Sequence, residues 1–307
     1  MTLCSLDRAS ADQPLPKYTR SDGAAGIQQY VPGRWGMIAV DVVNPADRPA
    51  EALSAMYFAG RPSLQYGRRL WLPARSKRSS WYPVLSPADL PADKGRVDVK
   101  SLLAVGAGDK EVLSGSPGGQ MLHAGMLSVV HERPVTAVIL EDDDEETHAA
   151  VAAMRQARAL STLTPNLRDP FPSSVETLDA LDQLVVAGDR LAEDPAGLVA
   201  VRRWLHGGGR VWIVLDRVQP APVSLLLGDA MRFHVVDRVG LTEVQIEGPI
   251  LGGADRQPVR QFEEPVDLVR VVGPDLLPTH QVNGWPASFW QRAGRGSVLF
   301  TTLGARA

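Results

Sequence analysis

The chain has 307 residues, a length at which two domains are expected rather than one core. Its formal net charge of -3 offers no general attraction to nucleic acid or to anionic lipid, so we expect no nucleic-acid partner. A single cysteine excludes an intramolecular disulfide and any cysteine-based metal site of the usual spacing.

Residues 1–27 form a polar segment that contains Pro14, Pro16, Gly23 and Gly26, and we predict that it is disordered or loosely packed. It lacks the apolar core of a signal peptide. No run approaches the eighteen apolar residues of a membrane-spanning helix, so the chain is expected to be soluble, with any membrane anchor outside it.

Residues 28–133 show short stretches of alternating apolar and polar residues separated by turn residues, the pattern of an antiparallel β-sandwich. The pattern resembles immunoglobulin-like modules, although the cysteine pair of antibody domains is absent. Such modules more often bind or space than catalyse. The expected strands span 37–44, 52–59, 68–74, 80–86, 97–105, 110–115 and 125–131.

At Pro134 the period changes, and residues 134–307 are predicted to be a second domain of the α/β class. A continuous apolar run at 135–140 predicts a buried strand, which is followed by an acidic run and a helix at 146–160. Further along, the pattern predicts a helix at 222–229, strands at 233–237, 241–247 and 266–272, and a closing strand at 297–303.

The most informative segment of this domain spans residues 178–216. An apolar run at 184–187 predicts a buried strand, a helical period begins at Pro195 and ends at the glycines 207–209, and a second apolar run spans 211–215. This is a βαβ unit with parallel strands. Asp216 follows the second strand, at the edge where open α/β sheets place their ligands.

This strand-loop-helix-strand pattern resembles the core of the class I glutamine amidotransferase-like fold over residues 134–307. The resemblance implies a flavodoxin-like open sheet with helices on both faces, a first loop at Ala187 and Gly188, and a sharp elbow at Asp216. Family members carry a nucleophilic cysteine at that elbow, whereas the only cysteine here is Cys4. A carboxylate cannot form the thioester of glutamine hydrolysis, so a degenerate domain is implied.

Two candidate sites follow from the strand ends. Asp142 and Asp143 belong to an acidic run after a buried strand and could bind Mg²⁺ or Ca²⁺, or could simply favour the start of the next helix. Gly188 and Asp189 follow one strand and Asp216 and Arg217 follow the next, so we interpret them as ligand-binding candidates, with an internal Asp–Arg pair as the alternative. Asp216 is also a candidate catalytic residue.

His280 is the second catalytic candidate, because it lies late in the chain, where the resembled family carries its histidine. Gln281 and Val282 follow it instead of the family's Pro and Glu, so an ordinary hydrogen-bonded histidine is the alternative. Among the aromatic residues, Trp35 and Trp71 are expected in the sandwich core, whereas Trp81 and Tyr82 are candidates for a sugar-contacting platform.

The sequence therefore predicts a non-catalytic binding or interaction module, the soluble ectodomain of a bacterial envelope protein facing the periplasm or the exterior. We expect no cofactor, and a partner that is a protein or a small molecule. One alternative is a metal-dependent hydrolase using Asp142, Asp143 and Asp216, and another is a carbohydrate-binding protein.

Overall fold

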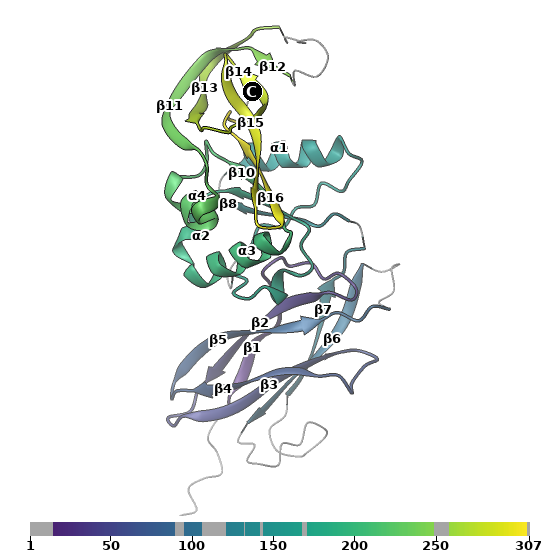
Figure 1. Ribbon diagram of the computed structural model, residues 1–307. Coiled ribbons are helices and arrows are strands. Elements are labelled where there is room, and N and C mark those ends of the chain that lie inside the picture. The colour runs from purple at the N-terminus through teal and green to yellow at the C-terminus, as the bar shows by residue number, and fades with distance from the viewer. Residues whose placement is uncertain are drawn as a thin grey trace, which may run out of the picture. The chain divides into compact units, whose positions relative to one another are not determined.

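A computed structural model describes most of the chain, and its residues form two compact units. Unit 1 comprises Met1–Ala25 and Gln29–Val129, and unit 2 comprises Gly26–Gln28 and Val130–Ala307. The described residues are 15–89, 95–105, 121–131, 133–141, 144–167, 171–248 and 258–305 (Figure 1).

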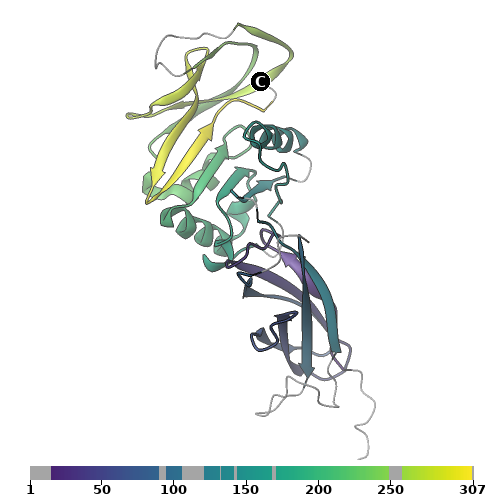
Figure 2. The same cartoon turned by 90° about the vertical axis from the view of Figure 1, so that its right-hand side faces the viewer.

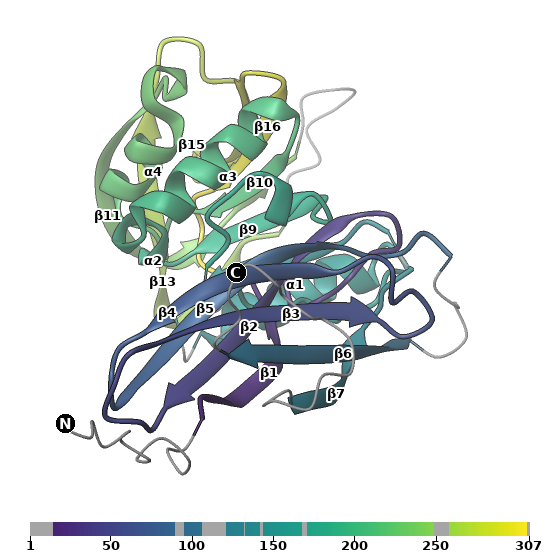
Figure 3. The same ribbon diagram turned by 90° about the horizontal axis from the view of Figure 1, so that it is seen from below.

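Unit 1 contains two sheets in which every strand pair is antiparallel, as a β-sandwich requires (Figure 3). The strand order is β1-β2-β5 in one sheet and β4-β3-β6-β7 in the other. The strands are β1 (Lys17–Ala25), β2 (Trp35–Asn44), β3 (Ala50–Phe58), β4 (Tyr66–Leu72), β5 (Ser76–Leu85), β6 (Arg96–Val105) and β7 (Met121–Ser128). The expected strand at 110–115 lies outside the described residues.

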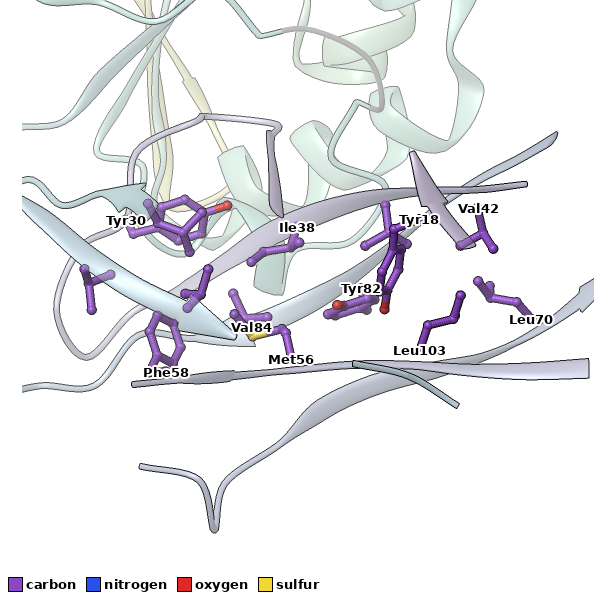
Figure 4. Packing of buried hydrophobic residues seen from close by; sticks show 14 of the residues in the cluster. Tyr18, Tyr30, Ile38, Val42, Met56, Phe58, Leu70, Tyr82, Val84 and Leu103 are labelled. Atoms are coloured by element: carbon purple, nitrogen blue, oxygen red, sulfur yellow. The ribbon is translucent and has the colours of Figure 1, made fainter. Parts of the chain in front are cut away.

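The core of unit 1 is built by the alternation of inward and outward side chains along its strands. In β2, Ile38, Val40 and Val42 are all fully buried in the main cluster. The alternate residues Met37 and Ala39 face the other side of the sheet, where they pack with Trp81. Figure 4 shows the main cluster, in which side chains from both sheets meet between two layers of strands.

The first strand corrects an expectation, because β1 lies within the segment predicted to be loose. Tyr18 is buried, and its hydroxyl lies 2.7 Å from Ser54 Oγ and donates to the carbonyl of Leu102 at 2.8 Å. Burial raises the pKa of Tyr18 to about 12. Pairing with β2 and the contacts of Tyr18 across the sandwich therefore order a polar segment whose own pattern predicts no strand.

Unit 2 is organised around a seven-stranded mixed sheet with the order β12-β14-β15-β16-β10-β9-β8. The strands β8, β9, β10 and β16 run parallel, and the remaining three pair antiparallel. A separate antiparallel ribbon is formed by β11 and β13. The strands are β8 (Thr136–Leu140), β9 (Gln183–Ala187), β10 (Arg210–Val214), β11 (His234–Val244), β12 (Ile246–Glu247), β13 (Arg260–Val272), β14 (Pro278–Val282), β15 (Trp285–Ala293) and β16 (Gly296–Thr301).

The helices of unit 2 begin and end at residues whose chemistry suits those positions. Asp144 and Asp194 are N-caps that accept hydrogen bonds from the N–H groups of Thr147 and Gly197. Gly208, with φ of 128°, ends α3 in a conformation that favours glycine. The α-helices are α1 (Glu145–Gln156), α2 (Arg190–Glu193), α3 (Pro195–Gly207) and α4 (Pro220–Leu227), and short 3₁₀ turns lie at Glu176–Leu178 and Gly228–Ala230.

The strand-helix-strand segment predicted around residues 184–215 is confirmed. β9 and β10 are parallel neighbours, with Val185 opposite Trp212, and α3 connects them. The helix α1, drawn in teal, lies beside one face of the sheet (Figure 2). Its Val151 packs there against Val138 and Val185. The local pattern was thus sufficient to predict the elements and their pairing.

The amidotransferase-like assignment is nevertheless wrong. The structure is mostly β, with 49% strand and 17% helix in several sheets. A flavodoxin-like open sheet with helices on both faces is not present, because three of the seven strands are antiparallel. On the face that bears Trp212, α1 packs near β8 and β9, and Trp290 on β15 is 54% exposed.

The chain after β10 also lacks the expected elbow. Arg217 N–H donates to the carbonyl of Val214 at 3.0 Å in an ordinary turn. A nucleophile elbow is a strained turn, but none of the described non-glycine residues with positive φ lies at 216–218. The turn therefore has neither the nucleophile nor the backbone geometry of that family.

No helix in the described part of the chain is both long enough and apolar enough to cross a membrane. The position of the protein in the cell remains a prediction of the sequence alone.

The anchoring of β1 by Tyr18 is testable with Tyr18→Phe. The substitution removes the hydroxyl that contacts Ser54 and Leu102, leaving buried polar atoms without a partner. We expect the free energy of unfolding of unit 1 to fall by about 1–3 kcal/mol, measured by urea unfolding, with faster amide exchange in β1.

Tyr57→Phe is the matched control, because the Tyr57 hydroxyl makes no hydrogen bond to another described residue. Its effect should stay within about 0.5 kcal/mol. Equal effects of the two substitutions would show that Tyr18 does not anchor the strand.

Candidate functional site

The carboxyl ends of the parallel strands carry two of the predicted site residues, Asp189 and Asp216, together with Glu141. Glu141 follows β8, Asp189 lies beyond β9, and Asp216 lies beyond β10. The Asp189 N–H donates to Glu141 Oε1 at 3.0 Å, and Asp189 Oδ1 accepts from the N–H of Gln219 at 2.7 Å. The loop after β9 and the turn after β10 are therefore joined directly.

Gly188 lies close to Glu141 at this edge. A Cβ atom at this position would lie 2.7 Å from Glu141 Oε1, so a larger residue would require the Glu141 side chain to move. The role of Gly188 as a ligand contact remains a prediction.

Arg217 forms the centre of an ion-pair network at this edge. Its Nη2 donates to Glu146 Oε2 at 2.8 Å, and its Nε lies 3.3 Å from Asp216 Oδ2 and 3.7 Å from Asp144 Oδ2. One guanidinium therefore serves three carboxylates of the protein itself.

Arg238, on β11, holds the turn after β10 from the other side. Its guanidinium donates to the carbonyl oxygens of Asp216 at 2.7 Å, Leu215 at 3.1 Å and Val218 at 2.7 Å. Since an unpaired carbonyl in a buried turn is costly, this single side chain stabilises the whole turn.

Asp216 is buried, and the pKa of its carboxyl is raised, because burial disfavours the charged form and the charge of Asp267 adds to this effect. The guanidinium groups of Arg217 and Arg238 act in the opposite direction. Its Oδ1 atom has no hydrogen-bond partner among the described residues. The Asp216 side chain is thus buried beside Arg217 and is not exposed to solvent.

The metal site predicted at this edge is not tested, since Asp142 and Asp143 lie outside the described residues. Within the described ranges, no three His, Cys, Asp or Glu side chains are grouped so that they could hold a metal ion. Magnesium or calcium binding stays a prediction of the sequence.

His280 is not brought close to Asp216. It lies on β14, exposed, with its Nδ1 atom 2.9 Å from Ser288 Oγ. The register places β15 and β16 between His280 and Val214 of β10, so three strand spacings, about 14 Å, separate them. These two candidates cannot act on one bond of a small substrate.

The sandwich aromatics differ from expectation at two positions, Trp71 and Tyr82. Trp71 was expected in the core, but it lies on the outer face of β4 with 54% of its surface exposed. Tyr82 is buried in the core cluster, which makes it unsuitable for a sugar platform. Trp81 is half-buried, and the guanidinium of Arg68 lies over its ring, 5.6 Å from the centroid.

A second site lies within unit 2, on the face of the sheet beside α1. It is a groove of about 670 Å³, bordered by α1 and by β8, β9, β10, β16 and β15. Trp212 and Leu299 are half-buried in it, and Trp290 is 54% exposed. We call this the Trp–Arg groove. Its charged lining residues are Arg155, Arg158, Arg210, Arg292 and Arg295.

The register of the strands arranges the floor of the Trp–Arg groove in two rows. Trp212 lies opposite Leu299, which lies opposite Trp290, and this forms an apolar row across three strands. Two residues earlier along β10, Arg210 lies opposite Ser297, which lies opposite Arg292 on β15. Since alternate residues share a face, both rows point to the same side.

The arginines of the Trp–Arg groove are not neutralised by the lining, which contains no carboxylate. Arg155 is buried and donates to Thr136 Oγ1 and to the carbonyl of Pro134. The other four are exposed and form no ion pair with another described residue. The groove is therefore a basic patch on a chain whose formal net charge is -3.

Sequence reasoning missed this groove, although part of its signal was present. Trp212 and Arg210 alternate along one strand, as do Trp290 and Arg292 along another. Both pairs show that a charged and an aromatic residue share a face. Only the insertion of β16 between these strands places the two pairs side by side.

No protein-family model and no curated protein matches the chain. Among solved structures, the cytoplasmic protein STM1381 from Salmonella typhimurium LT2 is 11% identical, with a TM-score of 0.38, 62% of this chain covered and 81% of that chain. The cytoplasmic protein STM3548 from Salmonella typhimurium is 11% identical, with a TM-score of 0.39 and coverages of 68% and 84%.

The SafA pilin of Salmonella enterica in complex with the SafB chaperone is 15% identical, with a TM-score of 0.26 and coverages of 46% of this chain and 62% of that chain. At these identities and TM-scores, none of the three likenesses carries an argument about what this chain does.

The pKa of Asp216 leads to a pH prediction for Asp216→Asn. Because the folded-state pKa is raised above 3.8, the folded state binds more protons than the unfolded state at pH values between the two pKa values. Stability is therefore lost as the pH rises through that window. We expect the unfolding midpoint of Asp216→Asn to exceed that of the wild type at pH 7, and the difference to vanish near pH 3.

Asp237→Asn is the matched control of opposite sign, because hydrogen bonding to Arg270 lowers the pKa of Asp237. This substitution should lower the midpoint at neutral pH, and the difference should disappear in acid as the wild type loses the same interaction. A lower midpoint for Asp216→Asn at every pH would show that the ionised carboxylate is a net stabilising part of the network.

Proposed function

We propose that the protein is a non-catalytic binding module and that its ligand or partner occupies the Trp–Arg groove of unit 2. The observation that carries the proposal is the combination of two indoles with five guanidinium groups in a groove that has no carboxylate in its lining. Exposed tryptophan and arginine are the residues most enriched where proteins bind other molecules.

The energetics of the groove support this proposal. Exposed apolar surface of this kind is unfavourable in water, and like charges on a shared face repel each other. A ligand that covers Trp290 and neutralises the arginines would relieve both costs. A groove built only for stability would be expected to contain acidic residues that pair with its arginines.

The carboxyl edge of the sheet supports the non-catalytic half of the proposal. Arg217 is engaged by Asp216, Asp144 and Glu146, and Asp189 accepts from the backbone. His280 lies on a distant strand. The polar groups here are directed at one another, which supports the interpretation of Asp216 and Arg217 as an internal pair.

The absence of catalysis is tested with the purified 307-residue chain and three substrates: glutamine, p-nitrophenyl acetate, and p-nitrophenyl phosphate with Mg²⁺. We expect no turnover above the buffer rate, and no change for Asp216→Ala, since the strand-end groups are held in ion pairs. Turnover at an enzyme-like rate that Asp216→Ala abolishes would refute the proposal.

The basic character of the Trp–Arg groove is tested by retention on a sulfonate resin at low ionic strength. Despite the net charge of -3, we expect the wild type to be retained, and the double variant Arg292→Glu with Arg295→Glu to elute in the void. The control is Arg202→Glu with Arg203→Glu, which changes the net charge equally on α3. Equal loss of retention in both double variants would mean that overall charge, not the groove, governs binding.

A further inference from the structure

Building on the proposed binding function, we propose that the Trp–Arg groove takes a small aromatic anion. The planar ring of this ligand lies on the row of Trp212, Leu299 and Trp290. Its phosphate, sulfonate or carboxylate group lies at the row of Arg210, Ser297 and Arg292. A nucleoside phosphate and a simple aromatic acid share this chemistry.

The size of the groove suits a small molecule. Its volume of about 670 Å³ lies inside the range of about 300–1,000 Å³ that is usual for small-molecule sites. The apolar lining includes Trp212, Trp290 and Leu299, and the charged lining consists of arginines. An apolar floor with a few convergent polar groups is the general composition of a ligand site.

The spacing of the two rows sets the shape of the ligand. Arg210 and Trp212 are two residues apart on β10, and Arg292 and Trp290 are two residues apart on β15. Two residues along a strand span about 7 Å. A ligand whose ring and acidic group are separated by a similar distance can therefore contact both rows at once, which neither a bare anion nor a neutral ring can do.

The aromatic row is prepared to receive a ring. The indole N–H of Trp212 donates to Thr301 Oγ1 at 2.9 Å, so the position of this side chain is set before any ligand binds. Trp290 lies two strands away with half of its surface exposed. Aromatic rings stack on such surfaces in offset geometry, and little conformational entropy is lost because one partner is already held.

The basic row is prepared to receive an anion. Arg210 and Arg292 lie on either side of Ser297, whose hydroxyl can donate a hydrogen bond between them. Arg295 lies in the turn that joins β15 to β16, and Arg158 lies just beyond α1. Guanidinium groups bind carboxylate and phosphate oxygens in pairs, so this end of the groove prefers a planar or tetrahedral oxyanion.

The test uses the full chain and the dye 8-anilinonaphthalene-1-sulfonate as the aromatic anion, followed by its fluorescence increase. N-phenyl-1-naphthylamine, which is the same ring system without the sulfonate, reports on the apolar row alone. We expect the sulfonate dye to bind with 1:1 stoichiometry, and the neutral dye to bind at least about tenfold more weakly.

Two substitutions and their matched controls locate the dye. Trp290→Ala and Arg292→Gln should each weaken binding of the sulfonate dye by about tenfold or more. Trp71→Ala removes a tryptophan of equal exposure, 54%, from unit 1, and Arg203→Gln removes an exposed arginine from α3. Both controls should leave binding unchanged. Displacement of the dye by adenosine monophosphate or by indole-3-acetate then distinguishes a nucleotide from an aromatic acid.

The inference is overturned if the neutral dye binds as tightly as the sulfonate dye, if Arg292→Gln has no effect, or if the sulfonate dye does not bind. It is also overturned if Trp71→Ala weakens binding as much as Trp290→Ala. Loss of dye binding would leave the absence of turnover untouched, whereas turnover that depends on Asp216 would refute the non-catalytic function whatever the dye shows. The two failures are therefore distinguishable.

Discussion

The arrangement of unit 2 depends on the pairing of one strand, β16, with two neighbours of opposite direction. It runs parallel to β10 on one side and antiparallel to β15 on the other. Because side chains alternate along every strand, this register alone decides which residues share a face. It aligns Trp212 with Trp290 and Arg210 with Arg292, and a shift of one residue would place each pair on opposite faces.

The same sheet uses charge in two different ways. At the carboxyl ends of the parallel strands, Arg217 forms ion pairs with carboxylates of the chain, and Arg238 donates hydrogen bonds to its carbonyl groups. Both arginines therefore stabilise turns. On the face beside α1, the exposed arginines have no such partners among the described residues. Charges that are already paired within the protein have little capacity to bind a ligand, whereas unpaired positive charges attract an anion. The Trp–Arg groove is therefore a better candidate site than the carboxyl edge of the sheet.

Local sequence patterns predicted helices and strands correctly where the apolar spacing within a segment matched the face that it buries. Residues 184–187, 195–207 and 211–214 form the strand, helix and strand that their apolar spacing indicates, and the alternation in residues 37–44 produces a strand with two buried faces. The same patterns failed for β1, which is ordered by pairing with β2 and by the contacts of Tyr18 across the sandwich, and for Trp71, which the expected alternation placed on the wrong face.

The sequence by itself determined the β-rich first unit, the parallel strands around α3 and the absence of a cysteine nucleophile after β10, because these follow from side-chain period and residue identity. Only the tertiary structure decided that the sheet is mixed, that Asp216 and Arg217 are closed into an ion-pair network far from His280, and that two tryptophans and four exposed arginines line one groove. The physical reason is that strand order and register are set by contacts between segments up to about a hundred residues apart, for which no local period carries a signal.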